Sequence, residues 1–374
     1  MIVLCAANGY DEPGMTDWHM ARNLSRLIPV LYVDPPVSRL KRRGAARAPR
    51  LRMVSASLAR LTPAVLPFPS RPGMTAITSG ILRHYLRSAT TRLGGKVSAV
   101  ITAWPQFPVL GACGEDVSVY WAQDDYVGGA ELLGLDPAML AHRERKTAAA
   151  SDLVVVVSLV LRDVWANRGH EVVLIPNGAD TDGLQNVDSS PVPDDVELPA
   201  PVAGLTGRLN GRTDLALLEA ITERRCSLLL VGPASPELVT SRRFRALCAR
   251  STVQWTGRRP ASAIPGYLRR IDVGLVPYAD TSFNRGSFPL KTLEYLAAGR
   301  DVVSTPLPAT RWLNTHLITI ADGPEAFAGA VEKALSQPRT PELVRARQAF
   351  AAEHSWPRRA ADMHAVIVRR GKRG

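Results

Sequence analysis

The chain has 374 residues, of which 46% are hydrophobic and 21% are charged, a composition that excludes a disordered protein and fits two globular domains. Its formal net charge of +12 indicates an anionic partner, for which nucleic acid, anionic lipid and phosphorylated small molecules compete. The cysteines form no CxxC pair and the histidines no HExxH motif, so the sequence predicts a cytoplasmic protein with no disulfide framework, metal or resident cofactor.

The first residues, MIVLCA, are expected to form a β-strand, because the basic flank of a signal peptide is missing. The longest apolar stretch, residues 153–161, is far shorter than the ~20 residues of a membrane span. Short apolar runs alternate with helix-length segments along the whole chain, which is typical of parallel sheets covered on both faces. The predicted strands are Ile2–Cys5, Leu31–Asp34, Val97–Thr102, Val117–Trp121, Leu153–Val157, Val172–Ile175, Val202–Thr206, Leu228–Val231, Val253–Thr256, Val273–Val276, Val302–Ser304 and Leu317–Ile320.

These strands fall into two series of six, which predicts an α/β protein of two doubly wound, Rossmann-like domains facing a central cleft. The join is expected near residues 186–201, which are rich in Pro, Asp and Ser and lack periodicity. We therefore predict an N-terminal domain at residues 1–185, completed by a C-terminal helix at 356–374, and a C-terminal domain at residues 186–355. Trp356 is expected to anchor that helix, and His19 to serve packing on the first helix.

A glycine-rich turn follows the first strand of the second series, within GLTGRLNGRTDLALLEAI, residues 204–221. The strand ends at Thr206 and a helix is expected to begin near residues 213–214, so free N–H groups and the helix dipole favour an anion there. Arg208 and Arg212 add two guanidinium groups suited to phosphate oxygens. The spacing is not that of the GxGxxG dinucleotide fingerprint, and a turn with two surface arginines is the alternative.

The segment SFPLKTLEYLAAGRDVVSTPLP, residues 287–308, predicts a helix that begins at Pro289 and ends at Gly299, followed by a buried strand. Lys291 and Glu294 lie in its first turns. As a solvated pair they are worth only ~0.2–0.5 kcal/mol, and a lysine at a helix N-terminus is unfavourable unless an anion joins it. Contact with a ligand is therefore the favoured interpretation, and a solvated ion pair is the alternative.

The segments SFPLKTLEYLAAGRDVV, PNGAD and EHSWPRRA, with VYWAQDDY and ASDLVVVVS in the first half, resemble glycosyltransferases of the GT-B fold. The similarity spans most of the chain and is strongest over residues 281–308. It points to the family-four-like retaining enzymes, especially bacterial cell-surface polysaccharide transferases of the teichuronic-acid type. In that family the carboxyl domain binds a nucleotide-sugar and the amino domain binds the acceptor.

This resemblance implies a donor site at the start of the helix described above. Glu294 corresponds to the family's ribose-binding glutamate, whose carboxylate accepts hydrogen bonds from hydroxyl groups. The family cradles the diphosphate with the preceding loop and helix start, which correspond to Ser287, Phe288, Leu290 and Lys291. The resemblance therefore gives the unusual Lys291–Glu294 pair a role toward the nucleotide.

Further roles are implied by the same resemblance. The family's basic pair on the phosphates corresponds to Arg208 and Arg212, and Gly257 in WTGRRP lies where relatives hold the nucleobase. The implied mechanism retains the anomeric configuration, with Arg208 among the cations that stabilise the departing diphosphate. Asp124 and Asp125 follow a predicted strand and are candidates for orienting the acceptor hydroxyl or acting as a base. Capping of the next helix is the alternative, and it is favoured for Asp125.

The sequence departs from the family pattern at three places. Gly286 stands where the paired-glutamate motif needs an acid that touches the transferred sugar. Gln123 stands where many relatives have a histidine before the aspartate. The spacing from Arg208 to Arg212 is shorter than the usual gap between the family's arginine and lysine. These departures leave a weakened or inactive enzyme as an alternative.

Residues 39–52, RLKRRGAARAPRLR, carry seven cations and no acid, and the helical pattern at 81–93 adds Arg83, Arg87 and Arg92. Basic loops beside such helices are typical of attachment to anionic lipid, so we predict peripheral association with the inner face of the plasma membrane. A solvated loop and an ordinary sheet-covering helix are the alternatives. Nucleic acid is not expected, because no nucleic-acid-binding signature accompanies the charge.

The sequence thus predicts a glycosyltransferase of the hexosyltransferase type. It would move a sugar from a nucleotide-sugar to a polysaccharide or lipid-linked acceptor of the cell envelope. The alternatives are a GT-B-like sugar-nucleotide epimerase and a non-catalytic membrane- or nucleic-acid-binding protein on the same scaffold. Acceptor-dependent release of nucleoside diphosphate separates the three.

Overall fold

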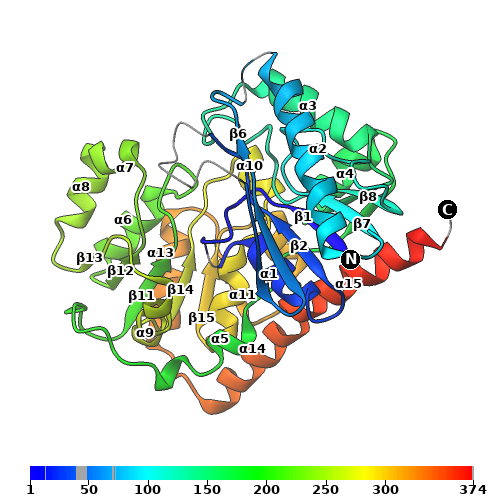
Figure 1. Ribbon diagram of the computed structural model, residues 1–374. Coiled ribbons are helices and arrows are strands. Elements are labelled where there is room, and N and C mark those ends of the chain that lie inside the picture. The colour runs from blue at the N-terminus through cyan, green and yellow to red at the C-terminus, as the bar shows by residue number, and fades with distance from the viewer. Residues whose placement is uncertain (13, 39–48, 70, 72, 373–374) are drawn as a thin grey trace. The chain divides into compact units, whose positions relative to one another are not determined.

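A computed structural model describes residues 1–12, 14–38, 49–69, 71 and 73–372. The chain divides into two compact α/β units (Figure 1). The first unit consists of Met1–Pro176 and Trp356–Gly374, and the second of Asn177–Ser355. Each unit has its own parallel sheet and its own core, so each is described by itself.

In the described part of the first unit, eight strands form one sheet in the order β10-β9-β8-β7-β1-β2-β5-β4. Neighbouring strands are parallel except β4, which pairs antiparallel with β5, and β3 and β6 form a separate parallel pair. The strands are β1 (Ile2–Cys5), β2 (Val30–Val33), β3 (Val37–Ser38), β4 (Arg50–Ser55), β5 (Leu58–Thr62), β6 (Ala64–Val65), β7 (Ala99–Thr102), β8 (Val117–Ala122), β9 (Leu153–Val156) and β10 (Val172–Leu174).

Helices cover this sheet. On one face, α2 (Met74–Leu93) buries Leu82 and Leu86 against apolar side chains of β1, β2, β5 and β7. Elsewhere α1 (Thr16–Leu24) packs along α15 (Trp356–Gly371), where Trp356, 2% exposed, stacks on His19 with ring centroids 5.3 Å apart. Both residues therefore serve packing. The remaining helices of the unit are α3 (Pro137–Ala149) and α4 (Leu159–Ala166).

The second unit has a six-stranded parallel sheet in the order β13-β12-β11-β14-β15-β16, as counted over its described residues. Its strands are β11 (Val202–Thr206), β12 (Ser227–Val231), β13 (Val253–Trp255), β14 (Val273–Val276), β15 (Asp301–Ser304) and β16 (Ile318–Ile320). All residues of the central strands β11, β12 and β14 are buried, as expected for parallel strands between two helical layers.

Helices enclose this second sheet as well. On one face, α6 (Leu215–Glu223), α8 (Arg242–Cys248) and α13 (Pro324–Ser336) bury Leu218, Phe244 and Phe327 in a common core. In contrast, α11 (Leu290–Ala297) packs on β14, β15 and α14 (Pro341–Glu353). The shorter helices are α5 (Thr181–Leu184), η3 (Val187–Ser189), α7 (Pro236–Thr240), η4 (Ala261–Ala263), α9 (Ile264–Arg270), α10 (Ser282–Gly286) and α12 (Pro308–Trp312).

All twelve predicted strands are present within one or two residues of their expected ends, and the predicted α/β class is confirmed. The four strands from β3 to β6 were not predicted. The interpretation of residues 39–52 as one basic loop is wrong for residues 50–52, which begin β4, and residues 39–48 lie outside the described part of the chain. β4 was missed because it is an edge strand with mostly exposed side chains, and β5 because Arg60 interrupts its apolar run.

The proline- and aspartate-rich segment at residues 186–201 lies inside the second unit. Two apolar side chains, Val187 and Leu198, are buried there, and Asp188 forms an ion pair with Arg300. Arg300 has no exposed surface, so this pair holds the segment against the loop before β15. The lack of periodicity at 186–201 therefore reflects an irregular but packed segment.

Candidate functional site

The sheet of the second unit has a topological switch point between β11 and β14. From β11 the chain crosses through α6 to β12 on one side, whereas β14, on the other side of β11, leads through α11 to β15. Open parallel sheets bind ligands at such a point, outside the carboxyl ends of their strands. The loops after β11 and β14 and the start of α11 therefore form the candidate donor site.

Three glycines, Gly207, Gly232 and Gly257, follow β11, β12 and β13 at this edge. The amide of Gly207 donates to the Val231 carbonyl at 2.8 Å, and the amide of Gly232 donates to the Gly257 carbonyl at 2.9 Å. A Cβ atom on Gly232 would lie 1.9 Å from the Gly207 carbonyl oxygen, and its φ of +140° also disfavours a side chain. Peptide groups rather than side chains therefore form this edge of the sheet.

Lys291 and Glu294 form an ion pair beside these glycines. The Lys291 Nζ atom lies 2.6 Å from Glu294 Oε2, and the two side chains are 25% and 19% exposed. The Lys291 Cε atom lies 3.1 Å from the place where Gly207 would carry a Cβ, so the lysine crosses the end of β11. Burial alone would lower the pKa of Lys291, but the Glu294 carboxylate raises it, so the ammonium group stays charged. The interpretation of the pair as fully solvated is therefore wrong.

The start of α11 has no side-chain cap. Pro289 is the N-cap residue and the helix begins at Leu290, one residue later than predicted, and the first-turn N–H groups of the helix have no intrahelical acceptor. Ser287 and Phe288 are buried, and the Ser287 hydroxyl donates to the Phe283 carbonyl at 2.8 Å. Leu290 is half-buried. These residues thus shape the helix start, where backbone N–H groups can receive an anion.

Helix α11 is fixed by its own Tyr295. The Thr206 amide, at the end of β11, donates to the Tyr295 hydroxyl at 2.9 Å. The Tyr295 ring lies over Gly274 of β14, where a Cβ atom would come within 2.2 Å of the ring. Tyr295 therefore fixes α11 against the two strands of the switch point. This places Lys291 at the sheet edge formed by Gly207, Gly232 and Gly257, here called the glycine edge.

The two candidate phosphate-binding arginines differ. Arg208 is exposed, and its side chain has no hydrogen bond or ion pair with another described residue. The Arg212 Nε atom donates to Asn284 Oδ1 at 2.8 Å, and its guanidinium lies over the rings of Tyr278 and Phe283 at 4.9 and 4.7 Å. Arg208 is therefore available to a ligand, whereas Arg212 positions the loop before α10.

The segment around Gly257 is held in place from one side. Tyr267 donates to Asp195 Oδ1 at 2.8 Å, and Arg259 pairs with the same carboxylate. The Trp255 ring packs edge-on against Phe244 with centroids 5.3 Å apart. Gly257 itself has no atom within 4 Å of its Cβ position, so there is open space beside this glycine.

Two departures from the family pattern have structural counterparts. Gly286 is buried at the end of α10 and offers no carboxylate.

Gln123, at the end of β8 in the first unit, donates to Asp17 Oδ1 at 2.5 Å. The Asp17 Oδ2 atom accepts hydrogen bonds from the amides of Ala7 and Asn8 and from Asn8 Nδ2. Burial raises the pKa of Asp17, and these hydrogen bonds oppose the rise. Gln123 therefore joins the loop after β1 to the loop after β8.

Asp124 and Asp125 have separate environments after β8. Asp124 is half-buried, and its backbone carbonyl accepts from the Tyr126 amide at 3.0 Å. Asp125 Oδ1 accepts from the Gly128 amide at 2.9 Å, so Asp125 caps the turn that follows. The next helix, α3, is capped by Asp136 instead. Asp124 remains the candidate for contact with an acceptor.

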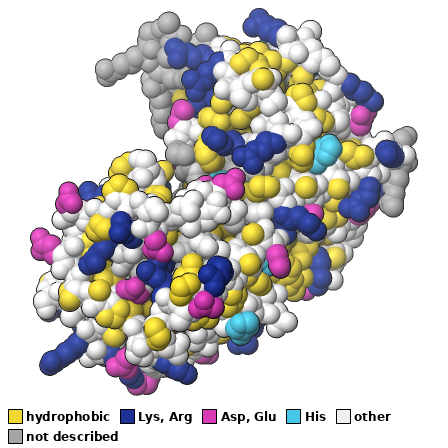
Figure 2. Space-filling model, turned by 90° about the horizontal axis from the view of Figure 1, so that it is seen from below, with side chains coloured by type: hydrophobic (Ala, Val, Ile, Leu, Met, Phe, Trp, Pro, Cys, Tyr) yellow, Lys and Arg dark blue, Asp and Glu magenta, His cyan; other side chains and the backbone are white. Residues whose placement is uncertain are grey.

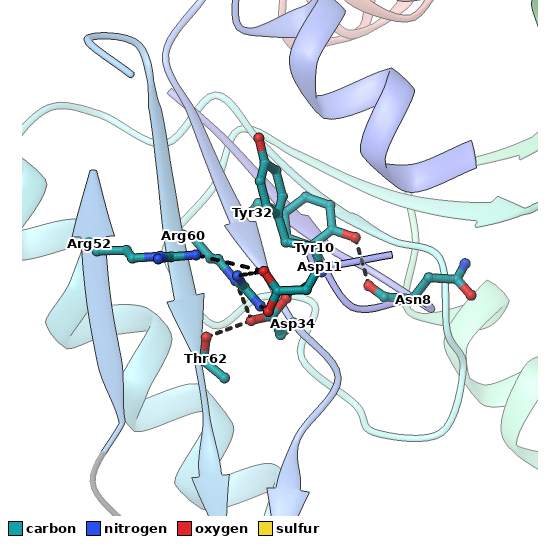
Figure 3. A network of polar contacts seen from close by, with 8 residues as sticks. All are labelled: Asn8, Tyr10, Asp11, Tyr32, Asp34, Arg52, Arg60 and Thr62. Atoms are coloured by element: carbon teal, nitrogen blue, oxygen red, sulfur yellow. Dashed lines mark hydrogen bonds and ion pairs between the residues drawn. The ribbon is translucent and has the colours of Figure 1, made fainter. Parts of the chain in front are cut away.

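A second polar network was missed by the sequence analysis (Figure 3). Arg60 of β5, 6% exposed, donates through Nε to Asp34 Oδ2 at 2.7 Å. Its two Nη atoms donate to the two oxygens of Asp11 at 2.6 and 2.8 Å. Sequence reasoning did not find this network because its members are 23 or more positions apart and share no local spacing.

The predicted basic patch is only partly described, because residues 39–48 lie outside the described chain. Arg83 of α2 donates to the carbonyls of Leu110 and Gly111, and Arg87 donates to that of Ala112, so both hold a loop. Figure 2 shows Lys and Arg side chains scattered among acidic and apolar ones on the face in view. No helix in the described residues is long and apolar enough to cross a bilayer, and their His, Cys, Asp and Glu side chains form no metal-binding group.

Residues 200–337 match the family described as Glycosyl transferases group 1. A Bacillus subtilis (strain 168) protein described as "Putative teichuronic acid biosynthesis glycosyltransferase TuaH" is 31% identical over 160 residues. That similarity covers 41% of this chain and 40% of the Bacillus protein, so the chain spans well under half of that relative.

Solved structures resemble the chain over nearly its whole length. Sucrose-phosphate synthase from Thermosynechococcus elongatus has a TM-score of 0.73 at 17% identity and covers 98% of both chains. A trehalose-6-phosphate structure from E. coli bound with UDP-2-fluoro glucose has a TM-score of 0.72 at 11% identity, covering 98% of this chain and 99% of the other. These likenesses establish the GT-B fold. The chain therefore has the GT-B fold, and its residues 200–337 are similar to the group 1 glycosyltransferases.

Proposed function

We propose that the chain is a retaining glycosyltransferase that moves a sugar from a nucleotide-sugar to a polysaccharide or lipid-linked acceptor of the cell envelope. The observation that carries this proposal is the glycine edge at the switch point of the second unit, with Lys291, Glu294 and the uncapped start of α11 beside it. A fixed cation and a helix N-terminus, beside a stretch of backbone that carries no side chains of its own, suit a diphosphate.

In this proposal the donor lies along the glycine edge. Arg208, Lys291 and the first-turn N–H groups of α11 receive the diphosphate, and Glu294 accepts hydrogen bonds from the ribose. Gly257 offers peptide groups to the nucleobase. Positive charge placed where the departing diphosphate gains negative charge lowers the barrier to transfer. A sugar nucleotide bound to the E. coli relative of the same fold supports this class of donor.

The acceptor is assigned to the first unit, with Asp124 positioning its hydroxyl group. The teichuronic acid description of the Bacillus relative supports a cell-envelope glycan. The cations of residues 39–52 support peripheral contact with an anionic membrane, since each contributes about 1 kcal/mol near such a surface. Sedimentation with anionic and neutral vesicles at low and high salt tests this part, and equal binding to both lipids would contradict it.

The donor site is tested with Glu294→Gln. We expect calorimetric titration to show that the variant binds nucleoside diphosphate about 1.5–3 kcal/mol more weakly, the range for hydrogen bonds to a charged group. UDP, GDP, ADP and TDP are titrated separately, because the nucleobase is not assigned. Loss of the half-buried pair with Lys291 should also lower the unfolding free energy by about 1 kcal/mol.

Glu342→Gln is the matched control. Glu342 also forms an i, i+3 pair, with Arg345 at 2.9 Å, but this pair is exposed on α14. We expect its nucleotide affinity to equal that of the wild type. Equal affinities in wild type and Glu294→Gln would remove the donor assignment. Conversion of the nucleotide-sugar into its epimer without any acceptor would favour the epimerase, and no turnover of the nucleotide-sugar at all would favour the non-catalytic scaffold.

The acceptor side is tested with Asp124→Asn and Asp125→Ala. If Asp124 positions the acceptor, its variant should lose transfer by about the 10²-fold or more typical of general acid–base groups, with nearly unchanged donor affinity. Asp125→Ala should keep transfer and lose about 1 kcal/mol of stability, because it removes only a cap. A large fall in melting temperature for Asp124→Asn would make Asp124 a structural residue instead.

A further inference from the structure

The inner half of the Arg60 network is the buried Asp34 carboxylate, whose charge is paired and whose two oxygens are both hydrogen-bonded. Asp34, at the end of β2, is 4% exposed and accepts from Arg60 Nε on Oδ2. The same oxygen accepts from the Thr62 hydroxyl at 2.6 Å, and Oδ1 accepts from the Tyr10 amide at 2.8 Å. A buried carboxylate with three donors, one of them a guanidinium, needs no further ligand. Asp34 therefore fixes the guanidinium and neutralises its charge.

The outer half of the network consists of Asp11 and Arg52, whose side chains are exposed. The two Nη atoms of Arg60 point away from Asp34 and grip both oxygens of Asp11 (Figure 3). The Asp11 side chain is 78% exposed, on the loop that follows β1, whereas the arginine it covers is buried. Arg52 of β4 brings a second guanidinium. Its Nη2 atom lies 3.8 Å from Asp11 Oδ1, the oxygen that accepts from Arg60 Nη1. Two arginines thus converge on one exposed carboxylate.

This asymmetry makes Asp11 replaceable. The Asp11 carboxylate is 78% exposed, so it can turn into water without displacing other side chains, and an anion that takes its place would restore the hydrogen bonds of the Arg60 fork. The Arg60 fork would stay in place, because Asp34 and the strand hold it. A guanidinium fork with a second arginine beside it matches the two oxygens of a carboxylate or phosphate. With Asp11 turned away, Arg60 and Arg52 outweigh Asp34 by one positive charge.

We propose that Arg60 and Arg52 form an anion subsite for the acceptor, which Asp11 occupies in the free protein and leaves when an anionic acceptor binds. The proposal rests on the proposed function only in naming the ligand as the acceptor. The anion is a carboxylate of an acidic sugar or a phosphate of a lipid-linked acceptor, since the fork fits both. The ring of Tyr10, 5.4 Å from the Arg60 guanidinium carbon, forms a side of the subsite.

The test measures anion binding without a donor. Inorganic phosphate and glucuronate are titrated calorimetrically into wild type, Asp11→Asn, Asp11→Asn with Arg52→Ala, and Glu12→Gln. If Asp11 occupies the subsite for about 90% of the time, its removal should raise the apparent affinity for one anion about tenfold. The added Arg52→Ala change should reverse most of that gain. Glu12 is the exposed neighbouring acid and has no ion pair in the described chain, so its variant should resemble the wild type.

The two anions distinguish the sources of the ligand, and a gain for either one supports the subsite. Phosphate that binds the donor site contributes equally to all four proteins, so only differences between them count. No gain for either anion in Asp11→Asn would overturn the proposal. Asp11 would then serve only to hold the loop after β1 against Arg60. Melting curves check that every variant is folded. Because no nucleotide is present, the result stands whatever Glu294→Gln shows.

Discussion

At the carboxyl edge of the second sheet, Gly207, Gly232 and Gly257 pack backbone against backbone, so a ligand there would meet Arg208, Lys291 and the start of α11 rather than a side-chain network. At the carboxyl edge of the first sheet, side chains fill the loops and satisfy one another: Asp17 with Gln123, and Arg60 with Asp34 and Asp11. The first kind of edge suits a ligand part that never changes, such as a diphosphate. The second kind can be altered by single substitutions, which suits a variable acceptor.

The largest effect expected from this comparison is on the side-chain edge. Arg60→Leu leaves the Asp34 carboxylate buried without its cation. Breaking a buried ion pair in this way costs about 3–5 kcal/mol. Urea unfolding should therefore show a much lower midpoint for the first unit, and the donor affinity of folded protein should not change.

Arg52→Ala serves as the control for that experiment. The Arg52 side chain is 60% exposed, and its only ion pair with a described residue is the long contact with Asp11, so its removal should cost less than about 1 kcal/mol. Equal midpoints for the two variants would show that the Arg60 network adds nothing to the fold. The comparison between the two edges would then lose its energetic basis.

The glycine edge is tested by Gly232→Ala. A methyl group 1.9 Å from the Gly207 carbonyl must displace the backbone, and together with the strained φ this should cost about 3 kcal/mol. Because the loops after β11 and β12 move apart, nucleoside diphosphate affinity should fall at least about tenfold.

Gly257→Ala is the matched variant at the same edge. Its Cβ position is open, so only the cost of a positive φ remains, about 1–2 kcal/mol. Its nucleotide affinity should fall less than that of Gly232→Ala. If both variants bind nucleotide as well as the wild type, the close packing of the glycine loops has no part in donor binding.

The fold was predictable because its signals are local. Each central strand is a continuous apolar run, and Gly299 marks the end of α11 by a positive φ of +72°. At the candidate donor site, the glycine-rich turn after β11 and the start of α11 were each visible as separate local segments, but the packing of Gly207, Gly232 and Gly257 against one another, 25 positions apart in each step, was not. What the sequence did not reveal was that Arg212 binds Asn284, 72 positions away.

The polar networks of the first unit were not predictable from spacing. Asp17 and Gln123 are 106 positions apart, and Arg60 and Asp11 are 49 apart. Asp17 was visible in the segment DWHMARNL, but a lone acid in the first turn of a helix is also favoured by the helix dipole. Only the strand order, in which β8, β7, β1, β2 and β5 follow one another across the sheet, shows that these side chains meet.

The last expected effect is a pH dependence of the free energy of unfolding of the first unit, caused by Glu144. Glu144 of α3 is 5% exposed and accepts from the Tyr120 hydroxyl at 2.7 Å. Burial raises the pKa of Glu144 from 4.5 to about 7, and the bond from Tyr120 opposes the rise. Between these two values the native state holds a proton that the unfolded state has released. The free energy of unfolding should therefore fall as the pH rises from 4.5 to 7 and change no further above 7.

Glu144→Gln removes this titration and keeps an oxygen that can accept from Tyr120. Relative to wild type, the variant should gain about 2 kcal/mol of stability between pH 5 and pH 8. Urea unfolding at both pH values measures this, with Glu131→Gln, an exposed acid before α3, as the control that shows no gain. The gain should appear in the unfolding of the first unit, because Lys291 at the glycine edge stays charged throughout this range. The same pH dependence in Glu144→Gln and wild type would mean that Glu144 is ionised in the native state at pH 5.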